Sequence, residues 1–380
     1  MALTLTGWDG FDLYPEALAD FPSGAAVRSI GNGTDCIFTA AAARTAGQGI
    51  QFLDDGLEGN DNIAATDIGL LYPLDNPQLR SASVIAGASV RLDGATTSSI
   101  FSLIQVNGEI PVGLRVTSAG FLEVRAGVNS TNAIVVTASE PLPLGEWAFV
   151  EWYINVTPQV GDDDDLDIMS TIIRINGAVV AEMSLSDVGF TDIDFNLTDI
   201  AIGVAPSSAF NATQGGQFSL DNFYYGNQSG PTPAGDFLGE RAVLTRRADN
   251  VDTVGTVGFT QLDTGPVLDA LTSFDGASTG FQGNVPGDVL TVTSSDVFGF
   301  TVQSIDGVLT VHASAKDGIG AREVSPFVRA GSANFSSSAD SLGEGFGVRQ
   351  SAPFLTNPAT SAAWTQADVE ALGWGLEITA

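Results

Sequence analysis

The feature that most constrains the fold lies between residues 145 and 185, where apolar and polar side chains alternate with a period of two. The even positions of the first half are all apolar: Ala148, Val150, Trp152, Ile154 and Val156. Glu151 and Asn155 stand among aromatics on the other face, as in a strand with one buried face. Further on, Asn176-Gly177 separates two β-rich runs and supplies the positive φ angles of a type I′ turn. The region therefore predicts a strand followed by a tight hairpin.

Similar hairpin signals recur along the chain. Asn107-Gly108 and Ala119-Gly120 each separate two strand-like runs, and Asp306-Gly307 does the same between 298–305 and 308–313. Only two helical pieces are expected, over 266–273 and 366–372, the second with Thr365 as N-cap and Asp368 in a capping-box position. The expected fold class is all-β, with two β-sandwich or jelly-roll domains in tandem and very little helix.

A stretch rich in Gly, Pro and small polar residues, 229–235, separates two strand-like regions and predicts a linker. The 380 residues are too many for one typical core but suit two domains. We therefore expect a jelly-roll domain over 1–228, a linker over 229–235 and a smaller β-sandwich domain over 236–380, and we expect the two domains to fold independently.

The charge of the chain restricts its partners. It has 45 acidic against 14 basic residues, a formal net charge of −31. Such a surface repels nucleic acid and anionic membranes, so we expect neither as a partner. Cys36 is the only cysteine, which rules out an intrachain disulfide and a cysteine-based metal cluster. The first residues lack a basic segment with a long apolar core, and no apolar run suits a membrane span. Synthesis in a cytoplasm is the resulting expectation.

The order of these strands carries a first resemblance. The strand and hairpin over 145–185, followed by a closing strand over 218–225, resemble the concanavalin A-like, laminin-G-type jelly roll, and the likeness covers most of 1–225. Some proteins of this fold are glycosidases with a Glu-x-Asp-x-x-Glu pattern that sets two carboxyls on one face. That pattern is missing here, because the tracts 146–151 and 192–194 have the wrong spacing or identity. We expect Glu151 to point to solvent.

A second resemblance covers 236–380. The chain has Asp-Phe-Leu-Gly-Glu at 236–240, Lys-Asp-Gly-Ile-Gly-Ala-Arg at 316–322, and Asn-Pro-Ala-Thr at 357–360 followed by Trp364-Thr365. In this order they resemble a group of tailed-bacteriophage virion proteins, although the segment after Arg241 lacks the "L-x-P" of that group. The resemblance implies a structural protein on the exterior of the particle, as a head decoration, head fibre or tail appendage. It implies virion localisation after synthesis in the host cytoplasm, other virion proteins as partners, and a homo-oligomer, with a trimer as the natural guess.

The densest charge cluster is a candidate metal site. Its members are Asp162, Asp163, Asp164, Asp165 and Asp167. Adjacent carboxylates repel one another, and a hard cation such as calcium would relieve that repulsion. The alternative is a solvated hairpin tip, the default for such a run in so acidic a chain, and we favour it. Apart from calcium at this place, no cofactor is expected.

We expect no enzymatic activity. His312 is the only histidine, and it stands in a strand-like run, where we interpret it as a surface residue. A Ser-His-Asp or Cys-His arrangement needs a histidine, so none can be built elsewhere in the chain. The alternative function is a carbohydrate-binding module or degenerate glycosidase, for which a host glycan would be the ligand. Among the tryptophans that could stack on sugars, Trp152 is expected in the core, while Trp147 and Trp374 remain open. Arg241, Arg246 and Arg247 form the only basic cluster, a candidate contact with an acidic neighbour or an ordinary surface.

Overall fold

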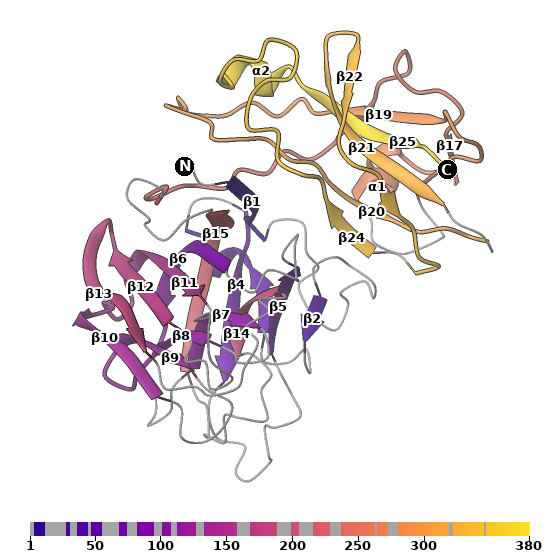
Figure 1. Cartoon of the computed structure of the whole chain (residues 1–380). Coiled ribbons are helices and arrows are strands. Elements are labelled where there is room, and N and C mark those ends of the chain that lie inside the picture. The colour runs from indigo at the N-terminus through magenta and orange to yellow at the C-terminus, as the bar shows by residue number, and fades with distance from the viewer. Residues whose placement is uncertain are drawn as a thin grey trace. The chain divides into compact units, whose positions relative to one another are not determined.

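A computed structural model describes most of the chain in a series of segments. The described residues are 4–11, 28–30, 36–44, 47–54, 68–73, 82–94, 101–107, 112–126, 133–157, 168–187, 199–204, 216–228, 237–262, 264–272, 280–318, 322–345 and 347–380. By their contacts they fall into two units, one ending at Thr245 and the other beginning at Arg246. Each unit is built mainly from antiparallel strands (Figure 1). The all-β class is therefore confirmed.

Two large antiparallel sheets make up the first unit. Sheet A has the order β13-β12-β11-β6-β15-β4-β3, with β1 also paired to β15. Its strands are β1 (Thr4–Asp9), β3 (Cys36–Thr39), β4 (Gly49–Asp54), β6 (Ala82–Leu92), β11 (Trp147–Thr157), β12 (Ile168–Ile175), β13 (Ala178–Asp187) and β15 (Gly216–Gln228). A short 3-10 helix, η2 (Ala40–Ala42), follows β3.

Sheet B has the order β10-β9-β8-β7-β14-β5-β2. Its strands are β2 (Arg28–Ile30), β5 (Ile68–Pro73), β7 (Phe101–Asn107), β8 (Val112–Val116), β9 (Phe121–Ala126), β10 (Ala133–Pro141) and β14 (Asp199–Val204). Many side chains of both sheets are fully buried, among them Trp152, Phe218, Leu114, Val124 and Ile202.

The short turns form where the sequence predicts them. Asn176 and Gly177 have φ angles of 50° and 82° and join β12 to β13, as a type I′ turn requires. Gly120, with φ of 83°, closes the turn between β8 and β9, and β7 pairs with β8 as expected. These turns fix the register of the strands that they connect.

The second unit is built on a six-stranded sheet, sheet C, with the order β16-β19-β25-β21-β22 and β23 paired to β21. Its strands are β16 (Asn250–Val251), β19 (Val289–Thr293), β21 (Glu323–Ala330), β22 (Ala333–Ser336), β23 (Asp340–Ser341) and β25 (Gly373–Ile378). Two small sheets pair β17 (Thr260–Gln261) with β18 (Phe281–Gln282) and β20 (Val311–Ser314) with β24 (Gly347–Gln350). A Cβ on Gly375 would lie 1.8 Å from the Leu290 carbonyl oxygen, so the central strand β25 needs glycine there.

Two short helices occur where they are predicted. They are α1 (Val267–Thr272) and α2 (Gln366–Glu370), and the second begins with the expected capping box of Thr365 and Asp368. The predicted hairpin at Asp306-Gly307 is wrong. Ile305 instead forms a bridge to Trp364 and Val308 forms one to Phe354, so burial against distant segments overrides the local turn signal.

The division between the units differs from the predicted boundary. The predicted linker, 229–235, lies outside the described residues. The described segment after it, 237–245, belongs by its contacts to the first unit, and the division falls after Thr245. The contacts of 237–245 with sheet A form part of the candidate site described next.

Candidate functional site: the outer face of sheet A

Strand β11 is buried on both of its faces. Trp152 and Ile154 point to one side together with the apolar residues of β6, and Trp152 is 1% exposed. Glu151 and Tyr153 point to the other side and are 0% and 1% exposed. The face that carries Glu151, here called the outer face of sheet A, is therefore covered at Glu151 and Tyr153, although it also carries polar residues.

The strand register arranges this outer face in rows across the sheet. One row joins Trp147, Arg91, Ser219 and Gln51 on four neighbouring strands. The next row joins Phe149, Ser89 and Asp221, and a third joins Arg174, Glu151, Gly87 and Tyr224. Polar side chains thus occur in every row. Their roles follow from the hydrogen bonds that they make.

The third row is covered by the segment 237–245, here called the strap. Glu151 Oε1 accepts hydrogen bonds from the Tyr224 hydroxyl at 2.6 Å and from the Gly239 amide at 2.8 Å. The Leu238 amide donates to the Tyr224 hydroxyl at 3.4 Å, and the Arg174 guanidinium lies 4.7 Å above the Phe237 ring. Apolar packing accompanies these bonds, because Phe237 and Leu238 lie against a buried cluster that includes Tyr224. The strap is therefore part of the first unit's fold.

The prediction that Glu151 points to solvent is wrong. Its carboxylate is fully buried, and its Oε2 lies 3.8 Å from Arg174 Nη1. Burial and the neighbouring carboxylate raise the pKa of Tyr224, so this hydroxyl stays protonated and donates. A buried carboxylate with two donors and one cation holds the strap in place.

The second row is tied together by a bulge in β15. The register shifts between Asp221 and Tyr224, and Asn222 has a φ of 54°. The Asp221 carboxylate accepts from the amides of Arg44 and Asn222, each at 2.7 Å, and Asn222 Oδ1 accepts from the Val243 amide of the strap. The bulge thus turns an extra side chain toward the strap.

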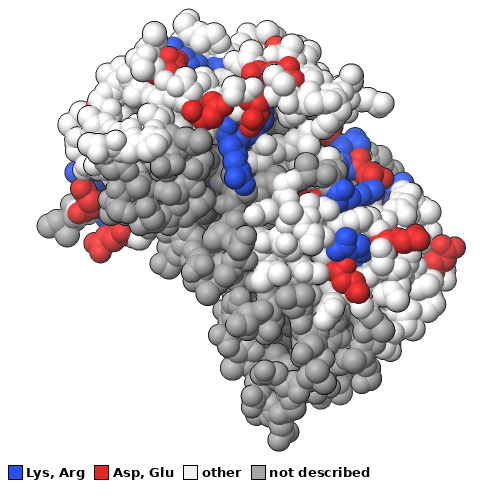
Figure 2. Space-filling model, turned by 180° about the vertical axis from the view of Figure 1, so that it is seen from behind, with Lys and Arg blue, Asp and Glu red and all other residues white. Residues whose placement is uncertain are grey.

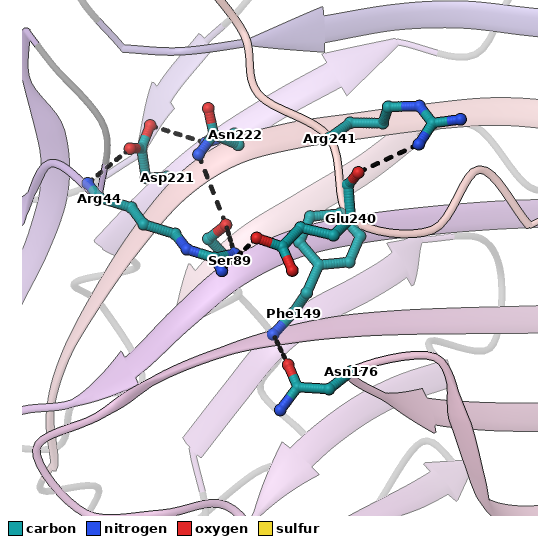
Figure 3. Close-up of polar contacts among 8 residues, drawn as sticks. All are labelled: Arg44, Ser89, Phe149, Asn176, Asp221, Asn222, Glu240 and Arg241. Carbon is teal, nitrogen blue, oxygen red and sulfur yellow. Dashed lines mark hydrogen bonds and ion pairs between the residues drawn. The ribbon is translucent and has the colours of Figure 1, made fainter. Parts of the chain in front are cut away.

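Arg44 crosses this row and meets the strap (Figure 3). It donates to Ser89 Oγ at 2.9 Å, and it pairs with the exposed carboxylate of Glu240. Figure 3 also shows Asn176 beside Phe149, whose amide donates to the Asn176 side chain at 2.8 Å. The loop after η2, the bulge and the strap are therefore held by one polar network.

The first row of the outer face is partly exposed. Asp93, just after β6, accepts from Arg91 Nε at 2.5 Å, from Gln51 Nε2 at 3.3 Å and from the Ser219 hydroxyl. The side chain of Arg91 is 22% exposed and that of Asp93 is 13% exposed. Arg91 lies 4.9 Å above the Trp147 ring, so one face of this indole is already occupied by a cation. The row combines planar polar groups with an aromatic edge.

Sheet B carries a second group of buried charges. Arg115 and Glu123 are cross-strand partners with exposures of 4% and 3%. Arg125 Nε lies 2.5 Å from the Glu123 carboxylate. Burial, with the neighbouring charge of Arg125, lowers the pKa of Arg115 to about 9. Arg115 and Glu123 are as deeply buried as the core, whereas the Arg125 side chain is 21% exposed.

The sequence motifs of the second unit make structural contacts. Trp364 is 4% exposed, and its indole N–H donates to the Phe354 carbonyl at 2.6 Å. Asn357 is also buried, and its side chain accepts from the Ala359 amide at 3.0 Å. The Lys316 amide donates to the Gly343 carbonyl at 2.9 Å. These three residues of the second resemblance therefore make local contacts within the second unit.

His312 is largely buried, which contradicts its interpretation as a surface residue. Its side chain is 9% exposed, and its Nε2 lies 3.8 Å from Asp340 Oδ2, too far for a hydrogen bond. Burial, with the positive charge of Arg349, lowers the pKa of His312 to about 4, and burial raises the pKa of Asp340. The imidazole is thus neutral at pH 7.

Arg246 is an internal anchor of the second unit. Its guanidinium donates to the carbonyl oxygens of Ser294, Asp296 and Glu370 at 3.0–3.1 Å and also to that of Val369. It satisfies the carbonyls at the end of α2, where a cation is also favoured by the helix dipole. Arg247 is exposed. The predicted basic cluster is therefore not a single surface.

The predicted calcium ligands cannot be placed. Asp162, Asp163, Asp164, Asp165 and Asp167 all lie outside the described residues. Within the described ranges, no group of three or more His, Cys, Asp or Glu residues could hold a metal ion. None of the described helices is long and apolar enough to cross a membrane. In the view of Figure 2, small acidic and basic groups lie side by side on the described surface, without a broad basic region.

Comparison with known proteins adds only distant likenesses. No family model matches the sequence, and no relative was found among curated proteins. A solved alginate lyase, Aly36B bound to alginate trisaccharide, is similar over 60% of this chain and 100% of its own, with 12% identity and a TM-score of 0.39. The cellulose-induced protein Cip1 is similar over 58% of this chain and 96% of its own, at 13% identity and 0.36. The carbohydrate-binding module CBM66 from Bacillus subtilis is similar over 53% of this chain and 96% of its own, with 10% identity and a TM-score of 0.31. Likenesses this weak carry no argument about ligand or activity.

Proposed function

We propose that this chain is a non-enzymatic structural protein on the exterior of a tailed-phage particle, made in the host cytoplasm and acting by assembly. The observation that carries the proposal is the structural use of its motif residues. Of the residues in which 236–380 resembles virion proteins, the Asn357 turn, the buried Trp364 and the Thr365–Asp368 capping box make local contacts within the second unit, whereas 237–240 belongs to the first unit. A resemblance in fold-defining contacts supports a shared fold better than scattered matches do.

The chemistry of the first unit supports a role without catalysis. Two of its buried carboxylates, Glu151 and Asp221, each accept hydrogen bonds from two internal donors. Asp93 is likewise held by three side chains of the first row. A general acid or base must reach a substrate, and groups so occupied are poorly placed for that task. They are well placed to keep a displayed β-sandwich rigid.

Particle composition tests the proposal. Particles released by the phage whose genome encodes the chain would be purified on a density gradient and analysed by mass spectrometry. The proposal expects the chain in the particle fraction at a fixed ratio to the major capsid protein, and gold-labelled antibody on the outer surface. A chain confined to the soluble lysate, or present only in traces that washing removes, would overturn it. The ratio would also give the copy number of the chain in the particle.

A second candidate function is glycan binding by the first row of sheet A. The specific observation is the partly exposed set of planar groups around Arg91, Asp93 and Trp147. A glycan array, with and without calcium, would compare the protein with Arg91→Ala and with the exposed control Arg241→Ala. Binding lost only in Arg91→Ala supports this function, and binding that needs calcium implicates the Asp162–Asp167 segment. No binding by the unaltered protein excludes it for the glycans on the array.

A further inference from the structure

The edge strands of the three larger sheets differ in how they are protected. An exposed sheet edge offers unpaired backbone groups, and proteins usually guard such edges with charges, proline or a covering segment. Most edges here carry such a guard: Glu182 and Asp187 on β13, Glu140 and Pro141 on β10, Arg28 on β2, and Asp249 and Asp252 beside β16. The β3 edge also lacks a charged residue and a proline, and its Phe38 side chain is buried. Strand β22 has neither guard among its own residues, although the Arg329 guanidinium of β21 donates to the Asn334 side chain at 2.7 Å.

Strand β22 is exposed and uncharged. The chain has no charged residue and no proline from Ala330 to Ala339. Ala333, Asn334 and Ser336 are exposed, while Phe335 packs partly against the buried cluster around Trp364. Among the described strands β22 pairs only with β21, so within the described residues its other backbone edge is open.

The geometry of the hairpin shows which backbone groups are free. Gly331, with a φ of 62°, is the first central residue of a two-residue turn between Ala330 and Ala333, as in a type II′ hairpin. In such a hairpin the flanking pair is hydrogen-bonded and the pairs alternate from there. Asn334 and Ser336 then stand in non-hydrogen-bonded pairs with β21. Their amides and carbonyls point away from β21, toward the open edge.

We propose that β22 is a self-association edge, at which two copies of this chain pair antiparallel through Asn334 and Ser336. The net charge of −31 makes two copies repel each other over most surfaces, and an uncharged edge is where they can approach with the least repulsion. An antiparallel edge is also complementary to itself across a two-fold axis, which is the symmetry of an isologous contact. The pairing would contribute to the assembly role proposed above. It rests on that proposed function only for its place in a particle, because the pairing itself is a property of the free chain.

The test uses the full chain in sedimentation velocity over a series of concentrations at low and high salt. Salt screens the acidic surface, so the dimer should tighten as salt rises. Ser336→Pro removes the outward amide, and Ser336→Glu adds a charge to the edge. Each should raise the dissociation constant at least tenfold. Thr264→Glu adds the same charge at an exposed position elsewhere in the second unit and should leave it unchanged.

Hydrogen exchange gives the site-specific measurement. The Asn334 amide should gain protection as the concentration of the unaltered chain rises, and it should not gain protection in Ser336→Glu. A chain that stays monomeric, a trimer indifferent to both Ser336 variants, or equal weakening by Thr264→Glu would overturn the proposal. These results leave the particle test unaffected, because a chain found in particles without this contact loses only the self-association edge.

Discussion

The two units differ in the charged groups that they bury and in the apolar side chains that they expose. The first unit buries charged groups such as Glu151, Asp221 and Arg115 and closes a strap over them. The second exposes apolar side chains. Among the large apolar side chains that are exposed in the described residues, only Leu144 and Val179 belong to the first unit. The rest belong to the second: Val254, Val257, Leu262, Val267, Val285, Val297, Phe300 and Leu355.

This difference suggests where each unit meets its surroundings. Buried, satisfied polar groups define one conformation but offer little to a partner. Exposed apolar groups can take part in a contact with a protein partner where they lie together on the surface. We therefore expect the second unit to make the assembly contacts and the first to be the displayed body. The predictions that follow are meant to break or refine this contrast.

The largest effect is expected from removing the strap. A fragment that ends at residue 228 lacks 237–245 and exposes the cluster of Ile85, Phe149, Tyr153 and Tyr224. We expect it to aggregate or to lose cooperative unfolding, because uncovering several buried aromatics costs a large part of a domain's stability. A fragment that ends at Thr245 should stay soluble and unfold cooperatively in a thermal scan. Equal stability of the two fragments would return the domain boundary to the predicted linker.

The next effect concerns the buried carboxylate under the strap. Glu151→Ala leaves the Tyr224 hydroxyl and the Gly239 amide without an acceptor and should lower the free energy of unfolding by about 3 kcal/mol. Glu151→Gln keeps an acceptor oxygen and should cost less. The exposed Glu146→Ala is the control, with a change within about 0.5 kcal/mol. If urea unfolding gave the same loss of unfolding free energy for Glu146→Ala as for Glu151→Ala, the role of Glu151 in anchoring the strap would be contradicted.

A pH effect is expected in the second unit. The pKa of His312 is lowered to about 4, whereas an unfolded histidine titrates near about 6.5. The unfolded state therefore binds more protons between these pH values. The contribution of the neutral His312 to the free energy of unfolding is complete above pH 6.5 and is lost as the pH falls toward 4. The raised pKa of Asp340 acts in the opposite sense and makes the net fall in stability smaller than His312 alone would give.

Two measurements check this pH effect. As the chain has one histidine, a single imidazole resonance reports its titration by NMR, and it should stay in the neutral position down to about pH 5. His312→Gln should flatten the fall in unfolding free energy between pH 6.5 and 4. A resonance that titrates near pH 6.5 would show an exposed ring and would contradict the burial described above.

The smallest effect distinguishes two adjacent arginines. Arg246→Ser removes four hydrogen bonds to backbone carbonyls around α2 and should cost about 1–2 kcal/mol of stability. Arg247→Ser, at an exposed neighbour, should cost less. If the variants have equal melting temperatures and both weaken particle association, the two arginines act as one contact surface, as the sequence suggested.

Local signals predicted much of the fold but little of the site. Period-two alternation and Asn-Gly placed β11 and the β12–β13 hairpin, because strand register and turn geometry are set by neighbouring residues. The capping box of α2 is local in the same way. The burial of Glu151 is not local, since the covering Gly239 lies 88 residues further along the chain. Likewise His312 is buried by β23 and β24, which no periodicity in its own strand reveals.

Some of this could have been found in the sequence. A glutamate between aromatics on a strand, with Tyr224 and Gly87 on predicted neighbours, suggests a covered carboxylate once the register is known. The strap itself was hidden by the assumption that a Gly and Pro stretch ends a domain. In this chain the stretch 229–235 precedes a segment that still completes the first core.

The most direct test of the contrast between the units is hydrogen exchange on the chain in purified particles compared with the free chain. We expect peptides of the second unit, especially those around Val254–Val257 and β22, to gain protection in the particle. Peptides of β11, already buried in the free chain, should exchange at the same slow rate in both. Protection gained only at the open row around Trp147 and Arg91, with the second unit unchanged, would contradict the account and make the first unit the contact surface.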